Sequence, residues 1–252
     1  MLRMRATAVR VRTGRAGTGG ARDLRAAVER VPLRLRVAYF VGVALLLAFL
    51  ASRGAVNRGG GAADEHGRTC PGGANFAGQT VAGVDLSQQQ LLCLNLERST
   101  LTGNVSDSNL ARANLYAAHL RNLWLNDVDL SVSDLRRADA AGLNMTGGRL
   151  AHADLRGAGL KGARFEDVGL QQAQLSGANL PSVGFTRSDL SGVDARGTDF
   201  TGASFYDSNL RGARLAGAKL DRTIWSNAVC PDGTKSSRND PESCDGHLTA
   251  AR

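Results

Sequence analysis

A large apolar residue returns at every fifth position through most of the chain. From Leu110 to Trp225, each of 24 consecutive positions divisible by five holds Leu, Phe, Met, Trp or Ala. Residues five apart turn by roughly 140° on a helix and change faces on a strand, so neither element keeps them on one side. The chain must therefore bend sharply once in every five residues.

A solenoid of square cross-section satisfies this period. Four five-residue sides bring the chain back over its start after 20 residues, and each short side stacks on the next coil about 4.8 Å away through backbone hydrogen bonds. The central residue of each side points inward, as does the residue two before it, which is mostly Ala, Val, Ser or Thr. The other three residues of each side are expected to face solvent.

One side of this solenoid tests the 20-residue coil independently. Every fourth central residue falls in a column that contains four of the five aromatic residues at central positions, Phe200 being the exception. Offset stacking favours like rings in one column. We therefore predict a structural core ladder of Leu125, Met145, Phe165, Phe185, Phe205 and Trp225.

A polar column agrees with the same coil length. On one side of the solenoid, the residue before the inward one is acidic at Asp134, Asp154 and Asp194. The residue after it is an arginine in the same three units, at Arg136, Arg156 and Arg196. Exposed ion pairs contribute about 0–1 kcal/mol each. We interpret this column as a device for solubility and register and not as an anion site.

The period changes phase near its start. An earlier run keeps the five-residue spacing but is one residue out of phase with Leu110; it comprises Phe76, Val81, Leu86, Leu91, Leu96 and Leu101. The segment TGNVSDSN between the two runs must hold a deletion or a small loop. The first coils are expected to be irregular, with residues 70–75 and 226–252 covering the open ends of the solenoid.

The repeated signature A-(D/N)-L-x-x, in units such as ANLYA, ADLRG and AKLDR, resembles the pentapeptide-repeat family. The resemblance covers about 150 of the 252 residues. It implies an all-β fold, a right-handed quadrilateral β-helix, which we assign to residues 70–229, followed by a C-terminal cap and tail at residues 230–252. Some members of the family resemble B-form DNA in shape and charge and protect DNA gyrase from quinolones.

The N-terminal segment differs in composition. Residues 37–52 carry no charge, and a helix over residues 33–52 would reach about 30 Å, enough to span a bilayer. Ten arginines precede residue 37, so the positive-inside rule places the basic segment 1–32 in the cytoplasm and everything after the helix outside. We favour a single-pass anchor in the cell membrane over a cleaved signal peptide or a buried helix, and we assign residues 53–69 to a flexible linker.

The net charge of +8 at first suggests a nucleic-acid partner, but the excess of basic residues lies outside the repeats. Residues 1–69 hold 13 Arg against 4 acids, whereas residues 70–230 hold 15 Arg and Lys against 15 acids. The repeats are thus neutral overall, which argues against nucleic acid as a partner. The preference for Arg over Lys, with abundant Ala and Gly, is typical of a high-GC bacterium.

Four cysteines fall where the ends of the solenoid are expected. Cys70 and Cys93 lie near its start, while Cys230 and Cys244 follow Trp225, taken as the last inward residue. Pairing within each end is the simplest connectivity and agrees with export. Zinc and free thiols are the alternatives, but the chain contains no CxxC and no close Cys/His pair.

The sequence offers no catalytic chemistry. It has no G-x-S-x-G, P-loop or dinucleotide-binding motif, and we expect no catalytic residue, cofactor or metal. Acids of the C-terminal loop do not have EF-hand spacing, and His119 and His152 fall at outward positions. Tyr116, Trp124 and Tyr206 also point outward and are candidate partner contacts.

Two functions remain. The first is a non-enzymatic, membrane-anchored extracytoplasmic scaffold that binds a protein or another envelope component along its flat sides. The second is a DNA-mimicking, gyrase-binding protein of the quinolone-resistance type, as the family resemblance suggests. Because a duplex mimic needs a strongly negative surface and an exported domain would not meet gyrase, the first is favoured.

Overall fold

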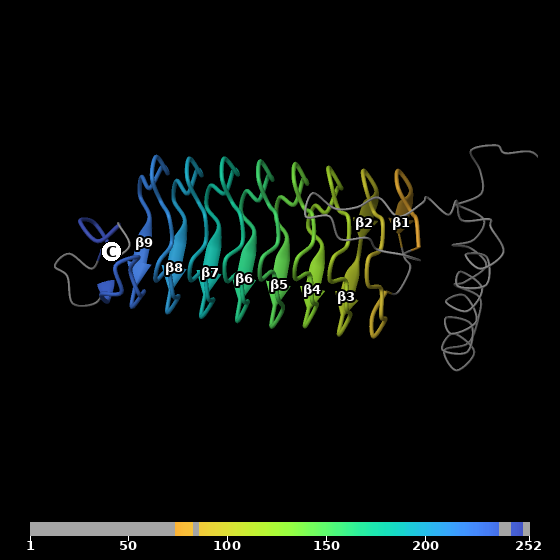
Figure 1. Ribbon diagram of the computed structural model, residues 1–252, viewed down its shortest axis with the longest axis horizontal. Helices are drawn as coiled ribbons and strands as arrows, with labels where there is room; N and C mark the ends of the chain where they lie inside the picture. The colour runs from red at the N-terminus through yellow and green to blue at the C-terminus, as the bar shows by residue number, and fades with distance from the viewer. Residues whose placement is uncertain (1–73, 83–85, 237–242, 249–252) are drawn as a thin grey trace, which may run out of the picture. The chain divides into compact units, whose positions relative to one another are not determined.

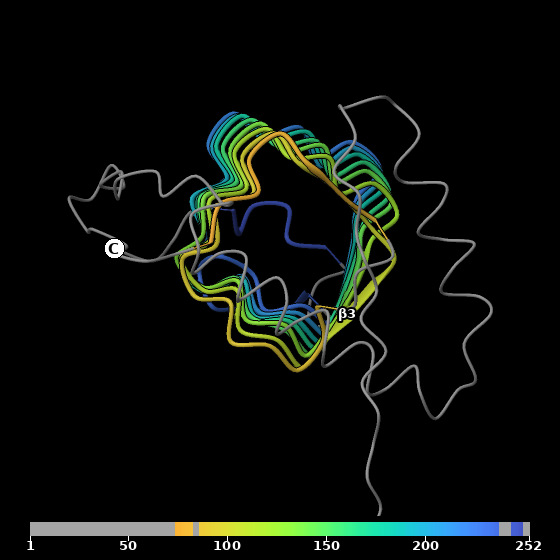
Figure 2. The same ribbon diagram turned by 90° about the vertical axis from the view of Figure 1, so that its right-hand side faces the viewer.

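The computed structural model describes residues 74–82, 86–236 and 243–248. These residues form an all-β parallel solenoid, and no α-helix occurs in the part described. The coils are stacked one after another in sequence order (Figure 1), and they superimpose around a closed outline when viewed along the stack (Figure 2). The all-β quadrilateral solenoid predicted from the five-residue period is confirmed.

Nine strands of three residues each supply the regular pairing. They are β1 (Thr80–Ala82), β2 (Thr100–Thr102), β3 (Asn104–Ser106), β4 (Trp124–Asn126), β5 (Asn144–Thr146), β6 (Arg164–Glu166), β7 (Gly184–Thr186), β8 (Ser204–Tyr206) and β9 (Ile224–Ser226). β1 pairs with β2, and β3 to β9 form one seven-stranded parallel sheet in sequence order. Each residue of β3 to β8 pairs with the residue 20 positions later, as Leu125 does with Met145. One coil is therefore 20 residues long.

The other three sides pair through single residues. Parallel bridges such as Asp134 to Asp154 and Asp139 to Gly159 repeat at the same 20-residue spacing. These sides end in tight turns: the amide of Ala113 donates to the carbonyl of Leu110 at 3.0 Å, and Arg112 between them has φ of 61°. A positive φ at this position is the property of a type II turn.

The change of phase is a one-residue deletion. The bridges from Gln90 to Asn109 and from Thr100 to His119 span 19 residues, whereas later parallel bridges span 20. Val105 is 3% exposed and begins the sheet column that continues with Leu125, so the side from Leu101 to Val105 has four residues. Gly103, with φ of 111°, makes the corner of this short side. The regular inward phase thus begins at Val105, one unit before Leu110. The sequence analysis had placed its start at Leu110.

The inward column beneath the sheet forms a stack of rings. Phe165 and Phe185 have centroids 5.2 Å apart, Phe185 and Phe205 5.4 Å, and Phe205 and Trp225 4.6 Å, with interplanar angles of 15° or less. Phe200, from a neighbouring side, meets Phe205 edge-on at 5.5 Å. Leu125 and Met145 continue the column below the rings, and all six residues of the proposed ladder are buried.

The D/N of the signature has a structural reason. The side chain of this residue accepts a hydrogen bond from the amide two residues later, for example Asn109 from Ala111 at 3.0 Å and Asp199 from Thr201 at 3.0 Å. Asn and Asp favour this local bond because their oxygen reaches a backbone amide two positions on. Where it makes this bond, the Asn or Asp of the signature closes the bend next to the inward residue.

The small residue two positions before each central residue also points inward and helps to fill the interior. Where this residue is Ser or Thr, its hydroxyl donates to a backbone carbonyl, as Ser133 does to Leu130 at 2.6 Å and Thr198 to Leu175 at 2.7 Å. At Gly148 even a methyl group does not fit, because a Cβ atom there would lie 2.7 Å from the backbone carbonyl oxygen of Val128. Within the described residues, no buried side-chain nitrogen or oxygen lacks a hydrogen-bond partner.

Several predicted segments lie outside the described residues. They are the basic segment 1–32, the anchor 33–52, the linker 53–69 and Cys70. In the ranges that the structure describes, no helix has the length and apolar character needed to cross a membrane.

Candidate interaction surface

The seven-stranded sheet presents one flat side of the solenoid, which we call the sheet face. It consists of the residues before and after each inward residue of β3 to β9: Asn104, Trp124, Asn144, Arg164, Gly184, Ser204 and Ile224 in one row, and Ser106, Asn126, Thr146, Glu166, Thr186, Tyr206 and Ser226 in the other. Only one Arg and one Glu occur among these fourteen positions. The sheet face is therefore almost uncharged.

Exposed apolar side chains gather on the sheet face. Trp124 is 53% exposed, Tyr206 51% and Ile224 61%; the remaining large hydrophobic residue with comparable exposure in the described part, Leu92, lies in the first coils. Trp124 and Tyr206 were predicted as contacts from their outward positions, but Ile224 was not. Its place directly before Trp225 in the repeat already indicates an outward side chain, since the residue next to an inward one points out.

Tyr116 does not join this group. It is half-buried on a different side, and the guanidinium of Arg136 lies 5.7 Å from the centre of its ring. Such a cation–π contact occupies one face of the ring. The three predicted contact residues thus divide into two on the sheet face and one held by an arginine elsewhere.

A shallow hollow lies in the sheet face at Gly184. It has a volume of about 290 Å³ and is lined by Arg164, Glu166, Thr186 and Ser204, among others. The hollow exists because Gly184 has no side chain in a row where neighbouring strands carry Arg and Ser. Glu166 is held at its edge by a hydrogen bond that Nη2 of Arg187 donates to its Oε1.

The side that carries the polar column has the opposite character, and we call it the Asp–Arg face. The outward residues before the inward position in the regular coils are Asn114, Asp134, Asp154, Gln174, Asp194 and Arg214. The outward residues after it are Tyr116, Arg136, Arg156, Ser176, Arg196 and Ala216. Seven of these twelve are charged. The arginines bind the acids of their own units: Arg136 to Asp134 at 2.8 Å, Arg156 to Asp154 at 2.6 Å and Arg196 to Asp194 at 2.6 Å.

Coils of the Asp–Arg face are also linked to one another. Nε of Arg136 lies 3.7 Å from a carboxylate oxygen of Asp154 in the next coil, and Asp154 is only 8% exposed. Hydrogen bonds from the Arg196 side chain hold the pKa of Asp194 below its usual value. These carboxylates are thus neutralised by arginines, in line with a role in solubility and register.

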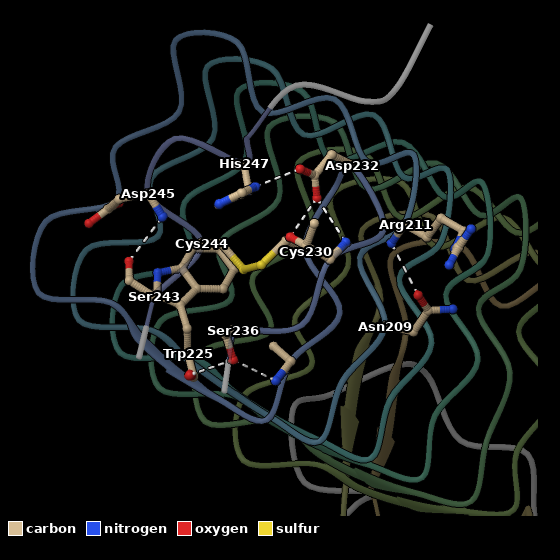
Figure 3. Close-up of a disulfide and its surroundings, with 12 residues drawn as sticks. Asn209, Arg211, Trp225, Cys230, Asp232, Ser236, Ser243, Cys244, Asp245 and His247 are labelled. Carbon is tan, nitrogen blue, oxygen red and sulfur yellow. Dashed lines mark hydrogen bonds and ion pairs between the residues drawn. A yellow bond between two sulfur atoms is a disulfide. The ribbon is translucent and has the colours of Figure 1, made fainter. Parts of the chain in front are cut away.

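A disulfide closes the C-terminal end of the solenoid. Cys230 and Cys244 are joined, and both are fully buried (Figure 3). Cys230 lies five residues after Trp225 and occupies an inward position itself, so Trp225 is not the last inward residue, contrary to the sequence analysis. Cys93 is also disulfide-bonded and lies at a left-handed corner with φ of 61°; Cys70, its expected partner, is outside the described residues.

Two polar contacts hold the chain around this disulfide. The hydroxyl of Ser236 donates to the carbonyl of Trp225 at 2.9 Å, and Nδ1 of His247 lies 2.6 Å from a carboxylate oxygen of Asp232 (Figure 3). Burial alone would raise the pKa of Asp232, but hydrogen bonds from the Thr234 amide, from His247 and from the Thr234 hydroxyl outweigh it and lower the pKa to about 2. The C-terminal residues 230–236 and 243–248 thus form a cross-linked cap.

The void along the axis between Leu120 and Phe165 is too small for a ligand. The void along the axis has a volume of about 10 Å³, no more than about one water molecule needs, and is lined by Leu, Ala and Phe. No group of three His, Cys, Asp or Glu residues close enough to hold a metal occurs in the described ranges. His119 and His152 are both exposed.

Comparison with known proteins agrees with the fold. The family description "Pentapeptide repeats" matches in eight copies, at residues 113–150, 133–170, 149–180, 170–207 and 185–222 among them. No curated protein sequence matches the chain significantly.

Several solved structures are similar to parts of this chain. A trypsin-treated variant of QnrB1, a plasmid-mediated fluoroquinolone resistance protein, is 18% identical with a TM-score of 0.41, over 58% of this chain and 90% of that one. HetL, a pentapeptide repeat protein involved in heterocyst differentiation regulation from the cyanobacterium Nostoc sp. strain PCC 7120, is 23% identical with a TM-score of 0.30. The match covers 64% of this chain and 93% of HetL. A pentapeptide repeat protein of the Arabidopsis thaliana thylakoid lumen is 25% identical with a TM-score of 0.21. The match covers 43% of this chain and 69% of that protein. These likenesses concern the fold alone. Through the repeats that match between residues 113 and 222, this chain belongs to the pentapeptide-repeat family.

Proposed function

We propose that the protein is a non-enzymatic scaffold, anchored in the cell membrane by residues 33–52, that binds an envelope component with a flat side of its extracytoplasmic solenoid. The observation that carries this proposal is the sheet face, which gathers Trp124, Tyr206 and Ile224 on one side of a sealed rod. Exposed apolar side chains on a rigid surface are typical of binding sites. Because the axis is filled by side chains, a partner must bind to the outer surface of the solenoid.

Two features support the extracytoplasmic location. The ten arginines before residue 37 favour a cytoplasmic N-terminus by the positive-inside rule. The Cys230–Cys244 disulfide is of a kind that forms and persists in oxidising compartments. Both features fit a domain that follows the anchor on the outer side of the membrane.

The charges of the solenoid favour the scaffold over the DNA-mimicking alternative. A mimic of duplex DNA occupies a site made for phosphates and needs a continuous negative surface. Here the acids of the Asp–Arg face are paired with arginines, and residues 70–230 balance 15 basic against 15 acidic residues. We therefore expect the purified protein to give no protection of gyrase against a quinolone in a supercoiling assay.

Protease accessibility in cells tests the location directly. Intact cells that express the C-terminally tagged protein are fractionated and treated with external protease, and thiols are alkylated before lysis. We expect the tag in the membrane fraction, removal of the tag by protease and no alkylated cysteine. A protease-resistant tag with four alkylated thiols would place the solenoid in the cytoplasm and overturn the proposal, as would restored supercoiling at stoichiometric protein.

A further inference from the structure

We infer that the sheet face binds a neutral, extended polysaccharide whose sugar rings stack on Trp124 and Tyr206. This inference rests on the proposed function, because it names the chemical class of the envelope component. It follows from three properties of the sheet face: its lack of charge, the arrangement of its aromatic residues and the hollow between them.

Charge separates the sheet face from the Asp–Arg face. Two of fourteen outward positions are charged on the sheet face, against seven of twelve on the Asp–Arg face. Most other outward side chains of the sheet face are Asn, Ser and Thr, which both donate and accept hydrogen bonds. Sugar hydroxyls have the same dual capacity, so a neutral sugar polymer matches this surface, whereas an acidic polymer or nucleic acid finds no positive field here.

The aromatic side chains are placed along the direction of a chain-like ligand. Trp124 in β4 and Tyr206 in β8 are four coils apart, or about 19 Å at the ~4.8 Å spacing of neighbouring strands. Ile224 lies in β9, one coil beyond Tyr206, and extends the apolar surface. A sugar whose hydroxyls are equatorial presents a face of C–H bonds, and these bonds pack on the electron-rich face of an aromatic ring.

The hollow at Gly184 lies between the two rings along the stack. Arg164 and Ser204 come from its neighbouring strands in the same row, and Arg164 is exposed and makes no ion pair with another residue of the described part. Its guanidinium can therefore donate several hydrogen bonds to a ligand. A hollow of about 290 Å³ accommodates a substituent or a ring edge of a polymer that lies flat on either side of it.

The sheet beneath this surface is rigid and fully paired. The ring stack from Phe165 to Trp225 supports β6 to β9 from below, and each interior strand pairs on both of its edges. A peptide cannot add to these strands by β-augmentation, since that requires an open edge. The surface offers instead a preorganised plane, which reduces the entropy lost when a polymer binds.

Binding of the full-length chain to insoluble chitin and cellulose tests the inference, with cross-linked pectate as the acidic counterpart. We expect saturable depletion of the protein by at least one neutral polymer, little change with salt up to about 0.5 M because few charges take part, and no binding to pectate. Trp124→Ala and Tyr206→Ala should each weaken binding at least tenfold, while Tyr206→Phe should retain it because stacking needs the ring alone.

A glycine pair supplies matched variants that preserve the fold. Gly184→Gln fills the hollow, and a Cβ atom at Gly184 would meet only Oγ of Ser204, at 3.6 Å. Gly159→Gln makes the same change at the same repeat position on another side, where the nearest atom is 3.9 Å away. We expect Gly184→Gln to weaken binding at least tenfold and Gly159→Gln and Tyr116→Ala to leave it unchanged.

Three outcomes would overturn the inference. They are no binding of the folded wild-type protein to either neutral polymer, equal effects of Gly184→Gln and Gly159→Gln, and binding only to pectate. Cross-linking at Trp124 to a membrane protein without any binding to a neutral polymer would also reject it, in favour of a protein partner. These results concern purified protein and polymer, so they are independent of the protease test of location.

Discussion

The sheet face and the Asp–Arg face are built from the same five-residue unit but differ in almost every other respect. The sheet face covers a stack of four aromatic rings and exposes two rings and an isoleucine to solvent. The Asp–Arg face covers Leu135, Leu155, Leu175 and Ala195 and holds charged pairs. The repeat constrains the inward positions most strongly, because those must fill the axis, and it constrains the outward Asn and Asp residues that close the bends. The remaining outward positions are free to diverge, and they give each face its own chemistry.

The last coil is covered unevenly. Trp225 beneath the sheet face, and Ala228 and Cys230 on the side that follows it, are buried beside the disulfide-linked cap, whereas Ala218 and Leu220, on the side between the Asp–Arg face and the sheet face, are only partly buried. The cap thus covers the sheet-face side of the terminal coil more completely. A terminal coil has a neighbour on one side only, so its stability depends on such coverage.

Removal of a ring is expected to have the largest effect on stability. Phe185→Ala should lower the free energy of unfolding by about 3–5 kcal/mol, because it empties a buried site between two stacked rings. Leu175→Ala, at the same repeat position beneath the Asp–Arg face, should cost about 2–3 kcal/mol, since no ring contact is lost. Denaturant unfolding of both variants measures the difference. A larger loss for Leu175→Ala would show that stacking does not distinguish the two columns.

Loss of the C-terminal disulfide is expected to follow in size. The bond between Cys230 and Cys244 closes a loop with a sequence separation of 14, which is worth about 3 kcal/mol in the chain-entropy description. Cys244→Ser should speed hydrogen exchange around Trp225 and leave the amides near Leu155 protected. Uniform acceleration along the solenoid would contradict a local role for the cap.

Ion pairs of the Asp–Arg face should contribute less. Asp154→Ala removes an acceptor for the Arg156 amide and guanidinium and a neighbour of Arg136, at a cost of about 1–2 kcal/mol. Asp194→Ala, whose carboxylate is more exposed and binds the arginine of its own unit, should cost less than about 1 kcal/mol. Denaturation at low and high salt compares the two variants. Equal losses would show that the link between coils adds nothing.

The smallest expected effect is a loss of cap stability at acidic pH. The pKa of Asp232 is lowered from 3.8 to about 2 in the folded protein, so its stabilising contribution is complete above pH of about 3.8 and is lost as the pH falls towards about 2. Trp225 fluorescence in a Trp124→Phe background follows the cap through this range. The change should be smaller in Asp232→Asn, and an identical pH profile in both proteins would exclude a role for Asp232.

Much of the fold follows from the sequence because inward positions tolerate few residue types. The five-residue spacing specified the sides, and the aromatic column specified the 20-residue coil without any knowledge of contacts. The exposure of Trp124 and Tyr206 was predicted from their phase alone, and that of Ile224 could have been predicted in the same way. The position of the deletion at Gly103 could not, since any residue of TGNVSDSN can be skipped in a sequence and only pairing with the next coil fixes which one.

The sequence by itself determined the solenoid, its inward columns and the neutral charge of its repeats, because each is a property of residues at fixed spacing. The 20-residue coil already assigns each outward residue to a side, but only the tertiary structure decided which of these residues contact one another. It placed Tyr116 beside Arg136 and away from Trp124, created the hollow at Gly184 between Arg164 and Ser204, and showed Cys230 in an inward position. The physical reason is that neighbours on a face are 20 residues apart in sequence, and they meet only when hydrogen bonds between coils set the register.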